Sequence, residues 1–166
     1  MTRNDLEIEL KPHSMAQVVD TLRSKVTSQV ERQGLELELD CDPQIAQMQI
    51  DIDMDYLIQI IINLTDNAIK FSAKAERKRI EIRCRAQNNQ RITIAVRDYG
   101  PGIAKDQLRK IFKLFYRSEN ELTRETVGTG IGLALVKQLT HAMHGSIDVI
   151  RHEPGAEFVL SFPVTS

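Results

Sequence analysis

The chain of 166 residues is 42% hydrophobic and 27% charged, and its net charge is −1 at pH 7. This length suffices for one domain with a buried core, and a charge near zero gives no general attraction to nucleic acid or to anionic membranes. Because the sequence has neither a membrane-spanning apolar run nor the apolar segment of a signal peptide, we expect a soluble cytoplasmic domain without direct membrane contact.

The N-terminal segment is predicted to form a strand followed by a helix. Apolar residues at every second position indicate a short strand over residues 6–10. Helical spacing of apolar residues then predicts an amphipathic helix over 14–33, with Ser14 as its N-cap. We interpret residues 1–13 as the end of a linker with the first strand, and residues 14–166 as a single domain.

A long helix over residues 54–72 is the most informative predicted element. It follows two short strands over 35–41 and 48–52, and either Asp53 or Asp55 is expected to cap it. Its polar residues occupy one narrow sector: Gln59, Asn63, Asp66, Asn67 and Lys70. A surface helix would carry more Lys and Glu, so we expect this helix to be largely buried, with its polar sector facing the inside of the fold.

The second half of the chain is predicted to contain a hairpin, two helices and two final strands. Alternation over 79–84 and 92–96, joined by Asn88 and Asn89, predicts the hairpin. The remaining elements are a helix near 105–116, a helix over about 133–145, and strands around 147–149 and 158–162. We therefore predict an α+β fold, a two-layer α/β sandwich in which a mixed, mostly antiparallel sheet of about five strands is covered on one face by about three helices.

Neither the two cysteines nor the four histidines favour a metal site. Cys41 and Cys84 fall on the apolar phase of strand-like alternations and lack ligand spacing, so we interpret them as reduced core cysteines. His141 and His144 are three residues apart near a helix end, which is more typical of surface and cap chemistry than of zinc.

Asn63, Asn67 and Lys70 recur at positions i, i+4 and i+7 and therefore share one face of the long helix. Two amide oxygens and an ammonium group presented together suit an Mg²⁺–phosphate group. The alternative is that the two asparagines only form hydrogen bonds with neighbouring loops.

Two glycine clusters lie further along the chain. Residues 98–102 (Asp-Tyr-Gly-Pro-Gly) permit close backbone approach to a ligand, and Asp98 ends a predicted strand just before them. Residues 128–132 (Gly-Thr-Gly-Ile-Gly) open a helix whose free N–H groups can bind phosphate oxygens. The spacing is not that of a dinucleotide-binding motif, and no strand immediately precedes it.

Four blocks, in this order, resemble the ATP-binding catalytic domain of sensor histidine kinases, in the superfamily shared with gyrase, MutL and the heat-shock ATPase chaperone. Residues 63–71 resemble its asparagine box, 98–103 its first glycine box, 111–117 its phenylalanine box and 128–133 its second glycine box. The resemblance extends over about residues 6–163.

The resemblance implies a site for ATP and Mg²⁺. Asn67 would give its amide oxygen to Mg²⁺, with Asn63 assisting directly or through water. Asp98 would accept the adenine amino hydrogen, and Arg117 would approach the γ-phosphate. Asn63, Lys70 and Arg117 are the expected catalytic residues. The other implied nucleotide contacts are Phe71, Gly100, Gly102, Ile103, Tyr116, Gly128, Thr129, Gly130, Ile131, Gly132 and Leu133.

Two of these residues have a second interpretation. Asp98 can be a turn residue that accepts a hydrogen bond from its own backbone, which is compatible with a role in binding adenine. Phe71 packs either near the adenine or only in the core. The polar segment between residues 115 and 128 has the composition of a lid that orders over nucleotide.

Asn63 occupies the position at which the superfamily's hydrolases carry a glutamate. An amide cannot take a proton at neutral pH, so the sequence favours phosphotransfer over hydrolysis; a neutral imidazole acceptor needs less help from a base. His13 is a poor acceptor because Pro12 opposes a continuing helix. The resemblance thus implies an acceptor histidine on a separate dimerisation domain of a longer, dimeric sensor kinase, which acts on a response regulator, and a monomeric isolated domain.

Two other functions are kept as alternatives. The first is a non-catalytic, nucleotide-responsive interaction module, against which the intact Asn67, Asp98 and Arg117 argue. The second is an anti-sigma-type serine kinase, against which the phenylalanine box argues.

Overall fold

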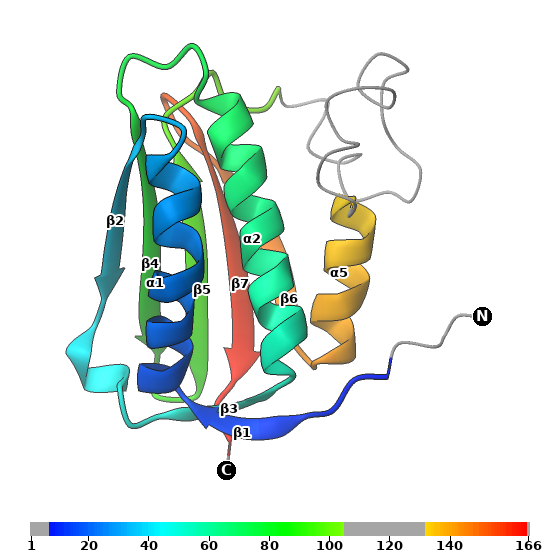
Figure 1. Ribbon diagram of the computed structural model, residues 1–166. Coiled ribbons are helices and arrows are strands. Elements are labelled where there is room, and N and C mark those ends of the chain that lie inside the picture. The colour runs from blue at the N-terminus through cyan, green and yellow to red at the C-terminus, as the bar shows by residue number, and fades with distance from the viewer. Residues whose placement is uncertain (1–6, 105–131, 166) are drawn as a thin grey trace.

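The computed structural model of the chain describes residues 7–104 and 132–165 (Figure 1). Within these residues, three α-helices lie side by side on one face of a five-stranded sheet. The helices are α1 (Met15–Glu31), α2 (Met54–Phe71) and α5 (Leu133–Ala142). The strands are β1 (Lys11–Ser14), β2 (Glu36–Cys41), β3 (Gln49–Ile52), β4 (Arg79–Gln87), β5 (Arg91–Asp98), β6 (Ser146–Arg151) and β7 (Ala156–Pro163), and a 3₁₀-helix spans Pro43–Ile45.

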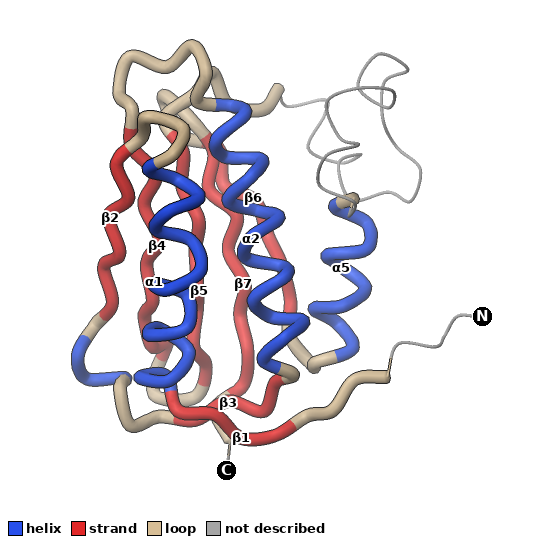
Figure 2. The backbone as a smooth tube through the Cα atoms, viewed as in Figure 1, coloured by secondary structure: helices blue, strands red, loops and turns tan. Residues whose placement is uncertain are grey.

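The five-stranded sheet has the strand order β2-β4-β5-β7-β6. β2 pairs with β4 in parallel, whereas β4 with β5, β5 with β7, and β6 with β7 are antiparallel pairs. The helices form one layer in front of the strands (Figure 2). The predicted two-layer sandwich with a mixed, mostly antiparallel sheet is therefore confirmed.

The first strand lies later in the chain than predicted. Residues 7–10 belong to no strand, and β1 begins at Lys11, which pairs with Ile52 of β3 in a separate two-stranded antiparallel sheet. The prediction was wrong because β1 is defined by this long-range pairing and not by local alternation. Pro12, which has no N–H, is tolerated because β1 is paired along one side only.

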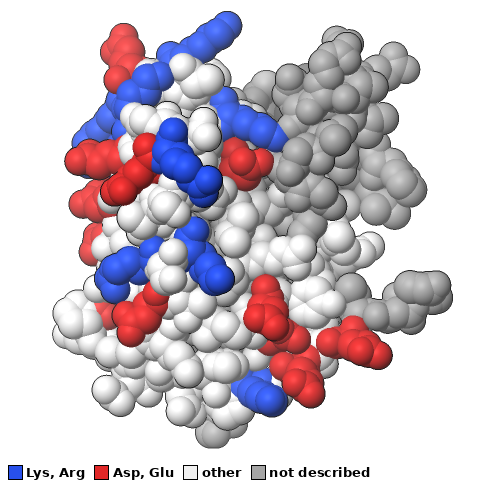
Figure 3. Space-filling view, viewed as in Figure 1, with Lys and Arg blue, Asp and Glu red and all other residues white. Residues whose placement is uncertain are grey.

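The two long helices begin where the sequence predicts. The side chain of Ser14 accepts a hydrogen bond from the Gln17 N–H at 3.2 Å, and that of Asp53 accepts one from the Tyr56 N–H at 3.3 Å. Asp53 is therefore the N-cap of α2, and Asp55 lies in its first turn. Acidic side chains gather at the lower right of Figure 3, the region in which α2 begins in the same view in Figure 1. Negative charge at the start of a helix stabilises it.

The β4–β5 hairpin turns at Asn88 and Asn89, as predicted. Both are the central residues of a turn closed by the Gln90 N–H donating to the Gln87 carbonyl, and both have a positive φ, 54° and 56°, which asparagine tolerates. The turn fixes the register of β4 against β5 and therefore the place at which β5 ends, at Asp98.

The core lies between the helices and the sheet. Alternate strand residues face the helices and are fully buried, among them Ile80, Ile82, Ile92, Ile94, Leu160 and Phe162. The intervening residues of β4 and β5 lie on the opposite face of the sheet, which carries charged residues such as Arg79, Glu81, Arg83 and Arg97. Among the residues that the structure describes, no helix has both the length and the apolar composition that a membrane span requires.

Candidate functional site

The polar sector of α2 contains a buried amide that has no hydrogen-bond partner. Asn63 is 3% exposed, and neither its Oδ1 nor its Nδ2 forms a hydrogen bond within the part of the chain that the structure describes. An unsatisfied buried polar group costs about 1–3 kcal/mol. Within the described residues Asn63 therefore bonds no neighbouring loop, and its amide fits a group that ligates something from outside the protein.

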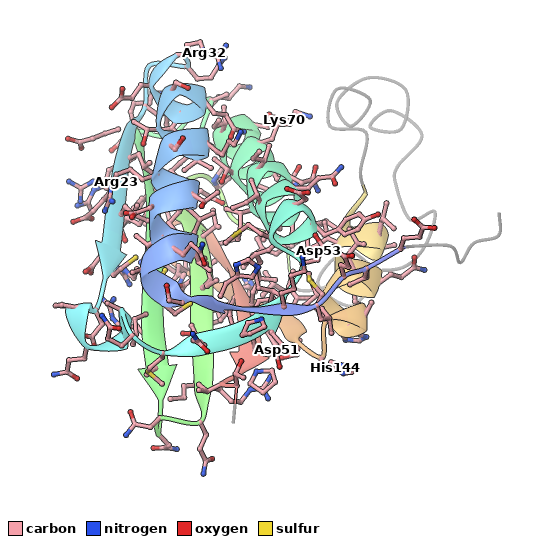
Figure 4. All side chains as sticks on the ribbon, turned by 60° about the horizontal axis from the view of Figure 1, so that its bottom comes forward. Arg23, Arg32, Asp51, Asp53, Lys70 and His144 are labelled. Carbon is pink, nitrogen blue, oxygen red and sulfur yellow. The ribbon has the colours of Figure 1, made fainter. Side chains whose placement is uncertain are left out.

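Asn67 and Lys70 lie one and two turns further along the same helix. Both side chains are partly exposed, in contrast to Asn63. The Lys70 ammonium group lies 3.6 Å from a carboxylate oxygen of Asp66, which belongs to the same polar sector. Figure 4 shows Lys70 at the far end of α2 from Asp53, its N-cap. The polar sector therefore runs from a buried amide to a half-exposed cation along one face of α2. Of its five residues only Asn63 is buried, so the expectation that the sector faces the inside of the fold holds for Asn63 alone.

Asp98 ends β5 and is 1% exposed. Burial raises the pKa of its carboxyl group, although hydrogen bonds from the backbone of Gly100 and Ala156 act in the opposite direction. Its Oδ1 accepts the Gly100 N–H at 2.9 Å, so the interpretation of Asp98 as a turn residue is confirmed. A further role in binding adenine is compatible with this turn and stays a prediction.

Two glycines allow the end of β5 to fit between α2 and the β6–β7 loop. A Cβ atom on Gly100 would lie 2.1 Å from the carbonyl oxygen of Phe71, the last residue of α2. A Cβ atom on Gly155, which has a φ of +106°, would lie 2.0 Å from the carbonyl oxygen of Asp98. Side chains at either position would separate these elements. The close approach at Gly100 is thus to α2, and an approach to ligand stays a prediction.

Gly155, which lies in the loop between β6 and β7, was missed by the sequence analysis. Its contact is with a residue in another strand, and no local pattern predicts such a contact. Gly102 belongs to the same arrangement, because a Cβ atom there would lie 3.0 Å from the carbonyl oxygen of Gly155. Its φ of +86° also favours glycine.

The sequence that forms α2 and the strand end at Asp98 matches a known protein family. The model of the family of histidine kinase-, DNA gyrase B- and HSP90-like ATPases matches residues 52–166. The chain belongs to this ATPase family.

Individual relatives of this ATPase chain are histidine kinases by name. The hybrid signal transduction histidine kinase L of Dictyostelium discoideum is 38% identical over 141 residues, which cover 82% of this chain and 8% of that protein. The sensor histidine kinase AtsR of Burkholderia thailandensis is 34% identical over 159 residues, which cover 95% of this chain and 25% of that protein. The chain thus spans about a quarter or less of these curated relatives.

A solved structure supports the fold of this ATPase domain over nearly its whole length. The crystal structure of full-length ShkA in complex with AMPPNP superposes with a TM-score of 0.75 at 27% identity. The match covers 97% of this chain and 33% of the ShkA chain.

The end of α2 and the start of α5 supply further predicted site residues of the ATPase domain. Phe71 is 38% exposed, so the interpretation that it packs only in the core is wrong. Gly132 is the N-cap of α5, and no side chain caps this helix. Ile103 and Leu133 are partly buried against the core. The start of α5 and the last turns of α2 point toward the same end of the molecule (Figure 1).

Several predicted contacts lie outside the described residues, and their roles stay predictions. They are Tyr116, Arg117, Gly128, Thr129, Gly130 and Ile131, together with the helix predicted near 105–116.

On the face of the sheet away from the helices, the ATPase domain has a polar cluster that the sequence analysis missed. The Tyr99 hydroxyl donates to Glu81 Oε2 at 2.6 Å, and the Arg77 and Arg97 guanidinium groups lie 4.6 and 4.3 Å from the centre of the Tyr99 ring. Glu81 is 2% exposed and forms ion pairs with Arg79 and Arg83. Burial opposes ionisation of Glu81, but the Tyr99 hydrogen bond and the arginine charges together lower its pKa.

Proposed function

We propose that this chain binds ATP with Mg²⁺ and transfers the γ-phosphate to a histidine on a separate dimerisation and phosphoacceptor domain of a two-component sensor kinase. The observation that carries this proposal is the buried, unpartnered amide of Asn63 in a domain of the histidine kinase-like ATPase family. By the resemblance to this superfamily, its hydrolases carry a glutamate at the position of Asn63.

Asn63 and Asn67 would hold Mg²⁺ through their amide oxygens. The unpartnered Asn63 amide fits such a role, since Mg²⁺ prefers oxygen ligands and usually takes only one or two from the protein. When bound, Mg²⁺ neutralises negative charge on the phosphate oxygens. Lys70, half-exposed beside Asp66, would contribute a further positive charge near the phosphates.

The buried Asp98 carboxylate would accept the adenine amino hydrogen. Guanine presents a carbonyl oxygen at that position, so an acceptor there favours ATP over GTP. Gly100 and Gly155 support this role, because they allow the strand end that carries Asp98 to lie close to both α2 and the β6–β7 loop.

Asn63 also bears on the type of reaction. Its amide cannot remove a proton from water, so hydrolysis of ATP by the isolated domain should be very slow. A neutral imidazole is already a nucleophile and needs less activation. Transfer to a histidine therefore suits this residue better than hydrolysis does, and the phosphohistidine would in turn supply a response regulator.

The experiment that tests this proposal supplies the missing acceptor. The dimerisation domain of the parent protein is mixed with this chain and labelled ATP, and we expect an acid-labile, alkali-stable phosphohistidine on the acceptor. Arg117→Ala should bind ATP nearly normally but transfer phosphate roughly a hundred- to a thousand-fold more slowly, because its charge acts where γ-phosphate charge develops.

The control is the isolated chain. It should bind ATP but release phosphate much more slowly than the superfamily's hydrolases do. An acceptor that stays unlabelled while ATP binds normally would contradict phosphotransfer and would favour a non-catalytic, nucleotide-responsive module. Label on a serine of an added partner would instead favour the anti-sigma-type activity.

A further inference from the structure

The two cysteines lie opposite each other on neighbouring strands. Cys41 is the last residue of β2, the edge strand of the sheet, and its register partner in β4 is Cys84. Both thiols are free. The preceding partners on the same side of the two strands, Leu39 and Ile82, pack in or against the hydrophobic core, so both thiols belong to the helix-facing side of the sheet.

Their backbone positions are compatible with a disulfide bond. Hydrogen-bonded strands lie about 4.7–4.9 Å apart, and the Cα atoms of disulfide-linked cysteines lie about 4.4–6.8 Å apart. Because Cys41 and Cys84 are direct register partners, their Cα separation is set by the strand spacing. Rotation of the two side chains can therefore bring the sulfur atoms into bonding range without displacement of β2.

We propose that Cys41 and Cys84 form an oxidant-reactive dithiol, in which Cys41 reacts with a peroxide and Cys84 resolves the product to an intramolecular disulfide. The two residues differ in exposure, as a reacting and a resolving cysteine should. Cys41 is partly exposed and can meet a small oxidant, whereas Cys84 is fully buried and is reached only through Cys41. This inference is independent of the proposed function.

The charges and hydrogen bonds around the pair also indicate that Cys41 reacts first and Cys84 second. A hydrogen bond with Cys84 lowers the pKa of the Cys41 thiol, and the positive charges of Arg23 and Arg85 also lower it, although partial burial and the charge of Asp40 act in the opposite direction. Arg23 extends from α1 on the side of the sheet where β2 runs (Figure 4). The same hydrogen bond, together with burial, raises the pKa of Cys84. Cys41 is thus the thiolate that reacts first, since the thiolate is the nucleophile.

The reaction has two balanced steps. The Cys41 thiolate attacks one oxygen of hydrogen peroxide, the O–O bond breaks, and hydroxide leaves, so that Cys41 becomes a sulfenic acid. Oxidation removes the negative charge of Cys41 that had opposed ionisation of Cys84. The sulfur of Cys84 then attacks the Cys41 sulfur, the S–O bond breaks, and the departing hydroxide takes up the Cys84 proton as water.

The dithiol lies away from the candidate nucleotide site. Cys84 pairs with Ile94, four residues before Asp98 in β5, and Cys41 lies one strand further out, at the end of β2 opposite to the end at which β5 reaches Asp98 (Figure 1). Oxidation should therefore leave ATP affinity within about two-fold of its reduced value, since no residue of the candidate nucleotide site changes. Absence of the disulfide would therefore contradict only the dithiol proposal, and absence of ATP binding would contradict only the proposed kinase function.

The test uses the whole chain, reduced and then treated with a small excess of hydrogen peroxide at pH 7. We expect intact-mass spectrometry to show a loss of two hydrogens, and digestion to yield a peptide in which Cys41 is linked to Cys84. The folded chain should lose its free thiols faster than the same chain in denaturant, because the lowered pKa of Cys41 leaves a larger fraction of it as thiolate than an unperturbed thiol has at this pH. The change should be reversed by dithiothreitol.

Two variants separate the roles of the cysteines. Cys84→Ser, whose hydroxyl can still donate to Cys41, should accumulate a sulfenic acid at Cys41 that dimedone captures, whereas Cys41→Ser should leave Cys84 unmodified. Far-UV circular dichroism checks that each variant is folded, and the wild-type mass measurement decides the question if either is not. A peroxide-treated wild type that stays reduced, forms only intermolecular disulfides, or oxidises no faster when folded than when denatured would overturn the proposal.

Discussion

Near the end of β5, the two faces of the sheet differ in how their buried polar groups are hydrogen-bonded. On the open face, Tyr99 donates to the buried Glu81, which also forms ion pairs with Arg79 and Arg83. On the helix-covered face, Asp98 is held by the Gly100 N–H, and the nearby helix α2 carries the unpartnered amide of Asn63. Buried polar groups that satisfy one another stabilise a fold, and an unsatisfied one indicates a ligand. On the open face Arg97 Nε also lacks a partner, but the same guanidinium group donates to the Pro154 carbonyl, whereas both amide atoms of Asn63 lack one. We therefore place the candidate site on the helix-covered face.

The strongest test of this comparison is removal of the predicted metal ligand. Asn67→Ala should reduce Mg²⁺-dependent ATP affinity by about a hundred-fold or more, since loss of an oxygen ligand exceeds the effect of losing a supporting contact. Titration calorimetry with and without Mg²⁺ measures this. Gln59→Ala, an exposed residue of the same polar sector, is the matched control and should bind normally. Equal affinities for Asn67→Ala and wild type would exclude the metal role.

Asp98 provides the next largest expected effect. Asp98→Ala should weaken ATP binding by roughly 1.5–3 kcal/mol, about ten- to a hundred-fold, because a hydrogen bond to a charged group is lost. The preference for ATP over GTP should fall as well. Calorimetric titrations with both nucleotides decide between the interpretations, because equal losses for ATP and GTP would mean that Asp98 is only a turn residue.

A substitution on the open face should lower stability and leave ATP affinity unchanged. Tyr99→Phe keeps the ring between Arg77 and Arg97 but removes the hydrogen bond to Glu81. We expect the free energy of unfolding to fall by about 1–2 kcal/mol, at the low end for a charged acceptor because Arg79 and Arg83 still neutralise Glu81. Guanidinium denaturation measures this loss, and ATP affinity should stay within about two-fold of wild type. A loss of affinity as large as that of Asp98→Ala would abolish the distinction between the faces.

The smallest expected effects concern pH. The lowered pKa of Glu81 means that its contribution to stability is present above its ordinary value and is lost as the pH falls through the folded-state value. The raised pKa of Asp98 means that stability is lost as the pH rises from its ordinary value through the folded-state value.

Denaturation at several pH values compares the two carboxyl groups directly. Relative to wild type, Asp98→Asn should become more stable as the pH rises from about 3 to 7, and Glu81→Gln should become less stable over the same range. Changes of the same sign in both variants would show that one of the two pKa directions is wrong.

Local patterns predicted much of the fold but little of the way its parts meet. Apolar spacing and caps placed α1 and α2, and Asn88 with Asn89 marked the hairpin, because these features depend on neighbouring residues. The strand predicted at residues 6–10 was wrong, because pairing with β3 decides where β1 lies.

In the candidate site, too, local features were predicted and contacts between elements were not. Helical spacing alone placed Asn63, Asn67 and Lys70 on one face of α2. It did not predict that Asn63 lacks a partner, that Gly155 contacts Asp98, or that Tyr99 contacts Glu81. Each of these facts depends on residues from different elements, which sequence periodicity does not relate.

The small β1–β3 sheet has a mechanical consequence. β1 leads directly into α1, while its partner β3 ends one residue before Asp53, the N-cap of α2. Asp53 also accepts the backbone N–H of Glu9 at 3.0 Å. A pull on the segment that enters β1 is therefore shared between two helices at once, and one of them is α2. Tension on the N-terminal segment has a route of hydrogen bonds to the base of the helix that carries Asn63 and Asn67.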